Sequence, residues 1–358
     1  MNIQAAVNRD DAWDATVFES TQRQNPVPIF VVTNELRQQV MYWKNRRNDC
    51  AHSKDNLIEA CHVDGIWAFT KSNLNKFVVN GSRPALQLKI SQHFNPALTP
   101  PGQSADRLVA EVGQAVIVAE LSDFLNDLAQ DFAASRTLDE VAADEVNRNQ
   151  IRFLDRCLAS TDPNLVTAVQ NQVIADRSLL RRVLRETPHR ASMLANHPQL
   201  VRQCWKEDLF STQGNDLPTL ASLFRNGLIP EAERVECLET VIRRGISSSP
   251  NEIDDATLGD VDFFVVLEQV AVDEGQLSNF DWANTSAVAI VQHLQRAPIT
   301  VGMARAIYQV FDNVHNPREV RPRLNTFFAG NNEKRNEFLN IEGENAEIGR
   351  PQHLPALQ

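Results

Sequence analysis

The segment KNRRNDCAHSK, residues 44–54, contains the densest group of chemically versatile side chains in this 358-residue sequence. Four basic residues stand beside asparagine, aspartate, cysteine and histidine. Histidine titrates near neutral pH and can transfer protons, and the planar fork of arginine matches phosphate oxygens. We consider three interpretations of this segment: a catalytic group acting on a phosphate ester, a metal site, and a solvated charged helix end.

The helix expected before and within this segment decides where its arginines point. Its apolar stripe has spacings of four, three and four residues and is formed by Leu36, Val40, Trp43 and Arg47. Arg47 thus continues the buried face, whereas Lys44 and Arg46 lie off it and are expected to be solvated. A guanidinium on such a face must be paired, extend to solvent or enter a cleft. The structural explanation is an ion pair with Asp49 or with an acidic residue of another helix.

A zinc site is the second interpretation. Cys50 and His52 are separated by one residue, and Cys61 and His62 are adjacent. Structural zinc ligands usually stand about two to four residues apart in each half of a site, and adjacent side chains point apart. We therefore expect no metal and no other cofactor, and we predict free cysteines on buried helix faces.

Composition restricts the class of protein. The formal net charge of -11 argues against a broad nucleic-acid-binding surface, so the basic segment suits local contact with one or two phosphates. Phosphate-loop, dinucleotide, zincin and serine-hydrolase motifs are absent, which disfavours those enzyme classes. Five scattered cysteines, no secretion signal and no apolar run long enough for a membrane span predict a cytoplasmic protein without a membrane contact.

The pattern along the chain predicts an all-α protein. A helix after the motif is expected to bury Ile66, Phe69, Leu74 and Phe77. Asp162-Pro163 opens another helix, with Leu165, Val169 and Val173 on one face. The predicted organisation is an N-terminal helical domain at 1–95, a linker at 96–105, an α-solenoid-like helical array at 106–330 and a loosely ordered polar tail at 331–358. No fixed repeat period emerges from the sequence.

Arg47-Asn48-Asp49-Cys50-Ala51-His52 resembles the Arg-Asn-x3-His form of the motif of HEPN domains. The basic flanks are similar to those of HEPN proteins in prokaryotic defence and toxin systems, and the resemblance covers about residues 30–80. It implies a helical bundle that cleaves RNA without a metal, with two motifs facing each other across a homodimer cleft. His52 would be the general acid or base, Arg47 would hold the scissile phosphate, and Asn48 would orient one of them. Lys44, Arg46 and Lys54 would contact the RNA.

This interpretation sets a geometric condition. Five residues turn about 140° on an unbroken helix, so Arg47 and His52 share a face only if the helix ends or kinks within the motif, or if a second chain completes the site. The alternative function is a non-catalytic helical interaction protein that uses the HEPN-like element for dimerisation and the array for a protein partner. A third interpretation is a subunit of a larger signalling complex whose NTPase part lies in another chain.

Overall fold

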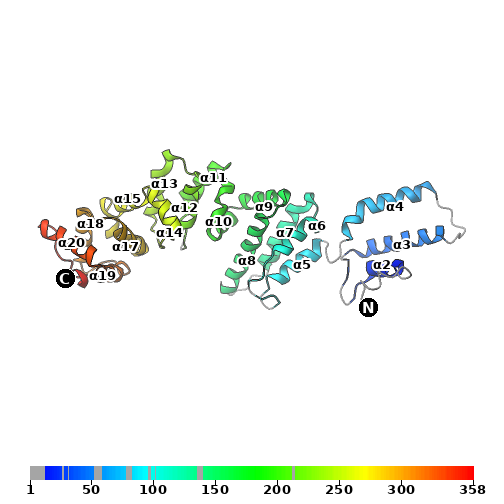
Figure 1. Ribbon diagram of the computed structural model, residues 1–358, viewed down its shortest axis with the longest axis horizontal. Helices are drawn as coiled ribbons and strands as arrows, with labels where there is room; N and C mark the ends of the chain where they lie inside the picture. Colours follow the sequence, from blue (N-terminus) through cyan, green and yellow to red (C-terminus); the bar gives the residue numbers. More distant parts are fainter. Residues whose placement is uncertain are drawn as a thin grey trace. The chain divides into compact units, whose positions relative to one another are not determined.

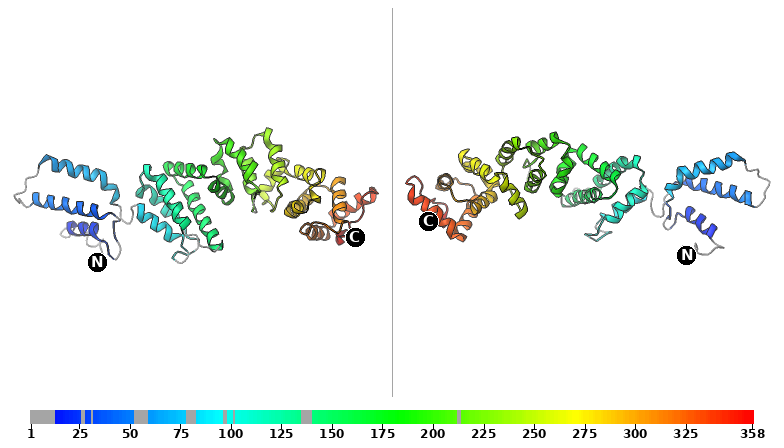
Figure 2. Two further views of the ribbon diagram at one scale, coloured as in Figure 1. Left: turned by 180° about the vertical axis from the view of Figure 1, so that it is seen from behind. Right: turned by 45° about the horizontal axis from the view of Figure 1, so that its top comes forward.

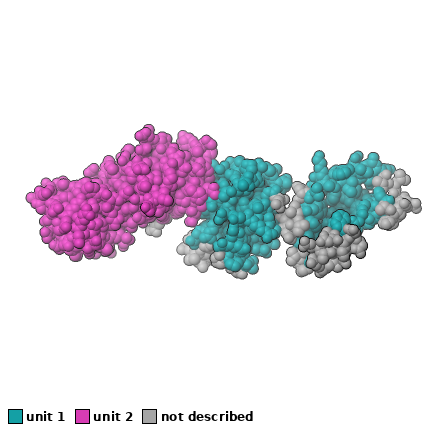
Figure 3. Space-filling model, in the orientation of Figure 1, with its two compact units in different colours: residues 1–177 teal, residues 178–358 magenta. Residues whose placement is uncertain are grey.

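The computed structural model describes residues 13–25, 28–30, 32–51, 59–77, 83–95, 98–100, 102–134, 140–211 and 214–358. These residues form helices and connecting segments with no β-strand among them, so the protein is all-α, as predicted (Figure 1). They divide into two compact units, residues 1–177 (unit 1) and 178–358 (unit 2), shown in Figure 3. Within the described residues, no helix is both long and apolar enough to cross a membrane.

Three helices of unit 1 surround the motif in the sequence. α2 (Trp13–Gln22) precedes it, α3 (Asn34–Ala51) contains Arg47, and α4 (Ala60–Asn73) follows it. The contact between α3 and α4 centres on Trp43, whose ring centroid lies 6.2 Å from that of Phe69. A Cβ atom added at Gly65 would lie only 2.9 Å from the Trp43 ring, so the absence of a side chain there lets the indole lie against the α4 backbone. Trp43 of the predicted apolar stripe on α3 therefore packs against α4.

The remaining helices of unit 1 are η1 (Leu74–Lys76), α5 (Arg83–His93), α6 (Asp106–Ala115), η2 (Val118–Glu120), α7 (Leu121–Ala134), α8 (Glu140–Leu158) and α9 (Pro163–Ala175). The helix predicted from Asp162-Pro163 is confirmed as α9, because the Asp162 carboxylate caps it and its three predicted core residues are fully buried. α5 packs against α6 and α7. The boundary predicted at 96–105 therefore falls inside one packed group of helices.

Unit 2 comprises many short helices, which are α10 (Arg177–Glu186), η3 (Pro188–Leu194), α11 (Pro198–Gln203), η4 (Cys204–Asp208), α12 (Leu217–Arg225), η5 (Glu231–Glu233), α13 (Arg234–Arg243), α14 (Glu252–Asp260), α15 (Phe263–Glu268), η6 (Gln269–Asp273), η7 (Gln276–Ser278), α16 (Phe280–Thr285), α17 (Ala287–Arg296), α18 (Val301–Phe311), α19 (Val320–Gly330), α20 (Asn332–Glu344) and η8 (Pro355–Leu357). Most of these helices pack on the next helix but one: α12 on α14, α13 on α15, α15 on α17, α17 on α19 and α18 on α20. In both views of Figure 2 the colours of this unit follow one another in sequence order.

Arginine–carboxylate pairs repeat through this packing. Four arginines bind carboxylates that lie 29 to 31 residues further along the chain: Arg185–Asp216, Arg202–Glu233, Arg225–Asp254 and Arg243–Glu274. The pairs join α10 to the residue before α12, α11 to η5, α12 to α14, and α13 to the residue after η6. These four contacts therefore have similar separations along the chain.

The C-terminal segment corrects a prediction. Residues 331–358 were expected to form a loosely ordered polar tail, but they contain α20 and η8, and α20 begins at an Asn331 cap that accepts a hydrogen bond from the Lys334 amide. Phe338, Leu354 and Leu357 are fully buried, and η8 packs on α19. The segment is polar in composition because only a minority of its residues are buried.

Candidate functional site

Arg47 lies near the end of α3, and its guanidinium forms an ion pair with a residue of another helix. Its Nη2 atom is 2.5 Å from Oδ2 of Asp14 on α2. Both side chains are more than half exposed, at 59% for Arg47 and 55% for Asp14. The expected partner on another helix is therefore confirmed, whereas the expected place on a buried face is wrong. The ion pair therefore stays in contact with solvent.

The neighbouring basic residues pack on aromatic rings. The Lys44 ammonium lies 3.5 Å from the centre of the Phe18 ring, and the Arg46 Nε donates to the Tyr42 hydroxyl at 3.3 Å. This hydrogen bond raises the pKa of Arg46. Both residues are partly covered, in contrast to the solvated positions predicted for them, because the aromatic side chains of α2 and α3 extend along their stems.

The remaining residues of the predicted site are described only in part. Asn48 is half-buried on α3, which is described as far as Ala51. His52 and Lys54 lie outside the described residues. The structure thus places Lys44, Arg46, Arg47 and Asn48 together on one helix. That Arg47 and His52 act at one site stays a prediction.

The structure describes three of the four side chains considered as zinc ligands, which are Cys50, Cys61 and His62. Cys50 and Cys61 are both exposed, so the prediction of buried cysteines is wrong at these positions. His62 closes a capping box at the start of α4, where its Nδ1 accepts a hydrogen bond from the Glu59 amide at 3.1 Å. Among the described residues, no group of three or more histidine, cysteine, aspartate or glutamate side chains is arranged to hold a metal ion.

An exposed apolar surface on α4 was not anticipated. The helix has no buried residue, although it carries the side chains predicted to form a core. The exposed residues on its outer side and in η1 are Val63, Ile66, Trp67 and Leu74, with exposed fractions of 49%, 38%, 69% and 66%. Successive spacings of three, one and seven residues keep all four within about one third of the turn of a helix, and we call this set the α4 surface. The prediction that Ile66 and Leu74 are buried is wrong.

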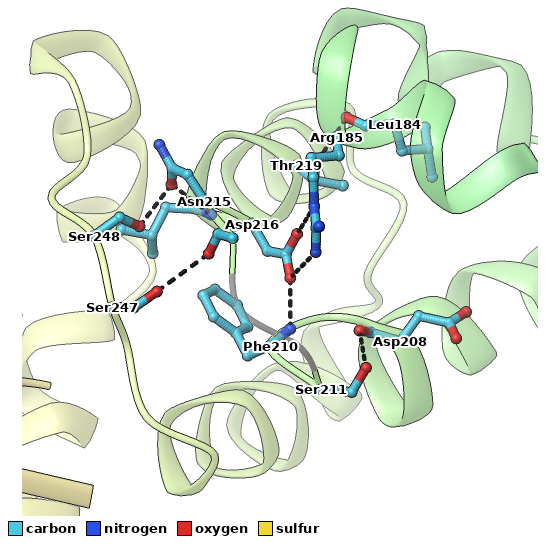
Figure 4. A network of polar contacts seen from close by, with 12 residues as sticks. Leu184, Arg185, Asp208, Phe210, Ser211, Asn215, Asp216, Thr219, Ser247 and Ser248 are labelled. Atoms are coloured by element: carbon cyan, nitrogen blue, oxygen red, sulfur yellow. Dashed lines mark hydrogen bonds and ion pairs between the residues drawn. The ribbon is translucent and has the colours of Figure 1, made fainter. Parts of the chain in front are cut away.

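A second polar cluster lies in unit 2 around the buried carboxylate of Asp216 (Figure 4). Asp216, 2% exposed, accepts hydrogen bonds from Arg185 Nε at 2.9 Å and from the Phe210 amide at 2.7 Å. Phe210 has a φ of 57°, so the carboxylate holds this residue in the left-handed region. Ser248 donates to Asn215 at 2.6 Å and extends the network to the next loop. Every described bond of the cluster joins parts of the scaffold, and its role is structural.

His293 on α17 is another buried titratable group of unit 2. Its Nε2 lies 3.0 Å from the Glu268 carboxylate, and the Thr300 hydroxyl donates to the other oxygen of that carboxylate. The Nδ1 atom is buried, with no hydrogen-bond partner in the described part of the chain. Burial lowers the pKa of His293, and Glu268 opposes this shift. The contacts join α15, α17 and the start of α18.

No protein-family model matches the chain, and no curated protein or solved structure is significantly similar to it. The resemblance to HEPN domains therefore depends on the residues from Arg47 to His52 themselves. The α4 surface depends on the structure alone.

Proposed function

We propose that this chain is a helical interaction protein that associates with a second copy of itself through the α4 surface. The observation that carries this proposal is the row of four exposed apolar side chains on a helix with no buried residue. Contiguous apolar surface is typical of protein interfaces, and tryptophan often supplies much of the binding energy.

A second copy is the partner that this surface fits best. Its four residues are uncharged and come from α4 and the adjoining η1. Two such rows can pack against each other about a twofold axis, where each residue meets the same surface on the partner. Because the row is uncharged, it offers no electrostatic attraction that would favour a charged partner over a second copy.

Replacing Trp67 by glutamate tests this proposal. We expect the wild-type chain to behave as a dimer at micromolar concentration and Trp67→Glu to be a monomer, because two carboxylates would be desolvated in the apolar contact. Light scattering coupled to size-exclusion chromatography, or sedimentation equilibrium, measures this difference.

Val314→Glu is the matched control, because Val314 is 74% exposed and lies in unit 2. This variant should remain dimeric. A wild-type monomer across the concentration range, or a Trp67→Glu dimer as tight as that of the wild type, would rule the proposal out.

A second candidate function is metal-independent RNA cleavage by the HEPN-like motif, favoured by the accessibility of Arg47. More than half of its side chain is exposed, and its partner Asp14 is a carboxylate that a phosphate could replace. In this proposal Arg47 binds the scissile phosphate, His52 transfers the proton and Asn48 orients one of them. Lys44, Arg46 and Lys54 hold the strand.

RNA cleavage in the presence of EDTA tests this second function. Arg47→Ala and His52→Ala should each lower the cleavage rate by about a hundredfold or more, as expected for loss of charge stabilisation or of general acid–base catalysis. Asp14→Asn should retain or raise the rate, because it releases Arg47 from its carboxylate.

Arg107→Ala is the control for loss of one surface arginine, since its side chain is 89% exposed. It should cleave like the wild type. Cleavage that survives both motif substitutions, or that EDTA abolishes, would refute the assignment.

A further inference from the structure

A groove lies between α17 and α19 in unit 2, and all of its lining residues are described. Its volume is about 510 Å³, and it is lined by Ser249, Val288, Val291, Gln292, Gln295, Pro322, Arg323, Thr326 and Phe327. This volume is within the range of about 300 to 1,000 Å³ that is usual for ligand sites. None of the lining residues is acidic, although the chain has 46 acidic residues and a net charge of -11.

The lining combines an apolar floor with fixed polar groups. Val288 and Val291 are half-buried, and Phe327 is 7% exposed, so they offer apolar contact at the base. Gln292 is held at both ends of its amide, since it donates to Asp255 and accepts from Ser249, each at 2.9 Å. A ligand side chain entering here would meet a preformed wall.

Arg323 is the charged residue of the lining, and two further arginines lie near it in the sequence. Arg318, Arg321 and Arg323 fall within six residues and are exposed. In the described part of the chain, none of the three has a side-chain hydrogen bond or ion pair, whereas the four arginines of the repeated pairs each bind a carboxylate.

The position of Arg323 connects this charge to the groove. Arg323 lines the groove together with Thr326 and Phe327, which follow it by three and four residues and so share its face of α19. Arg323 therefore places a positive charge beside the apolar side chains of the groove.

From these observations we infer that the α17–α19 groove binds an acidic segment of a partner protein, with a carboxylate on Arg323 and a large apolar side chain on the valines. The guanidinium fork of Arg323 matches a carboxylate in two parallel hydrogen bonds. Clustered arginines of this kind recognise acidic motifs in other proteins. RNA is a poorer fit, because the one aromatic ring in the lining is nearly fully buried and leaves no platform for base stacking.

This site is independent of the α4 surface. It uses residues of unit 2 only, and its occupant differs in chemistry from a second copy of α4. A monomeric wild-type chain would therefore leave the peptide-binding proposal intact, and failure of peptide binding would leave the dimer proposal intact.

The test uses the full chain and a short fluorescein-labelled peptide in which aspartate and glutamate alternate with leucine and phenylalanine. Two further probes are the same peptide with every acid replaced by its amide, and an oligouridylate. Fluorescence anisotropy should show binding of the acidic peptide that weakens with added salt. Arg323→Glu should weaken it by about tenfold or more, the effect of losing a charged hydrogen bond, and Arg323→Lys by less.

Two variants separate charge from apolar contact. Val291→Asp should weaken the acidic peptide with Arg323 intact, and Arg107→Glu in unit 1 should leave binding within twofold of the wild type. Thermal melting shows that each variant is folded. Equal binding of the acidic and amide peptides, an Arg323→Glu variant that binds like the wild type, or oligouridylate that binds more tightly than the peptide would overturn the inference.

Discussion

Asp216→Ala is expected to lower the free energy of unfolding by about 3 kcal/mol or more, the usual cost of removing one member of a buried ion pair. The substitution removes the acceptor for Arg185 and for the amide of Phe210. It leaves a partly buried guanidinium without its carboxylate and a left-handed residue without its support. For a unit of this size the melting temperature should fall by about 6 to 12 °C, which calorimetry or circular dichroism measures.

Two variants define what this result means. Asp216→Asn keeps the shape and one acceptor but loses the charge, so it should be less destabilising than alanine. Glu347→Ala breaks an ion pair with Arg305 at a residue that is 76% exposed, and it should leave the melting temperature unchanged within error. If Asp216→Ala melted with the wild type, the network in Figure 4 would have no structural role.

Phe338→Ala should cost about 3 to 5 kcal/mol, which is typical of a fully buried phenylalanine replaced by alanine. The ring has no exposed surface and lies 5.8 Å from that of Phe328, so its loss leaves a cavity between α19 and α20. Urea denaturation followed by far-ultraviolet circular dichroism measures the change in the free energy of unfolding.

The control for Phe338 is Phe280→Ala, because Phe280 is 46% exposed and belongs to the same unit. It should destabilise unit 2 much less. An unchanged denaturation midpoint for Phe338→Ala would mean that residues 331–358 contribute nothing to the core, as the sequence had suggested.

Helix starts and ends were the most predictable part of the fold. Asp162-Pro163 combines a capping carboxylate with a proline at the first turn, and local chemistry of this kind acts within a few residues. Gly227 and Gly245 follow the ends of α12 and α13, and both have positive φ angles. Helix starts and ends of this kind can therefore be predicted from a few neighbouring residues alone.

Partners at long range could not be predicted in the same way. The apolar row of α4 has the spacing of a core face, but spacing does not say whether the covering surface belongs to the same chain. Arg47 likewise required a partner, and Asp14 stands 33 residues before it with no local signal. Phe338 is a lone phenylalanine within a polar stretch, so its burial depends on Phe328 in another helix.

The repeated arginine–carboxylate pairs have a consequence for how unit 2 resists force. Each pair joins residues only 29 to 31 positions apart, and most of the α-helices pack on the next α-helix but one. The contacts that hold a helix therefore come from segments that are near it in the chain. A chain pulled from its C-terminus would lose η8 and α20 first and then the preceding helices in order. The unit would therefore extend in several small steps, each opposed by the contacts of one layer, and would recoil from the part that stays folded.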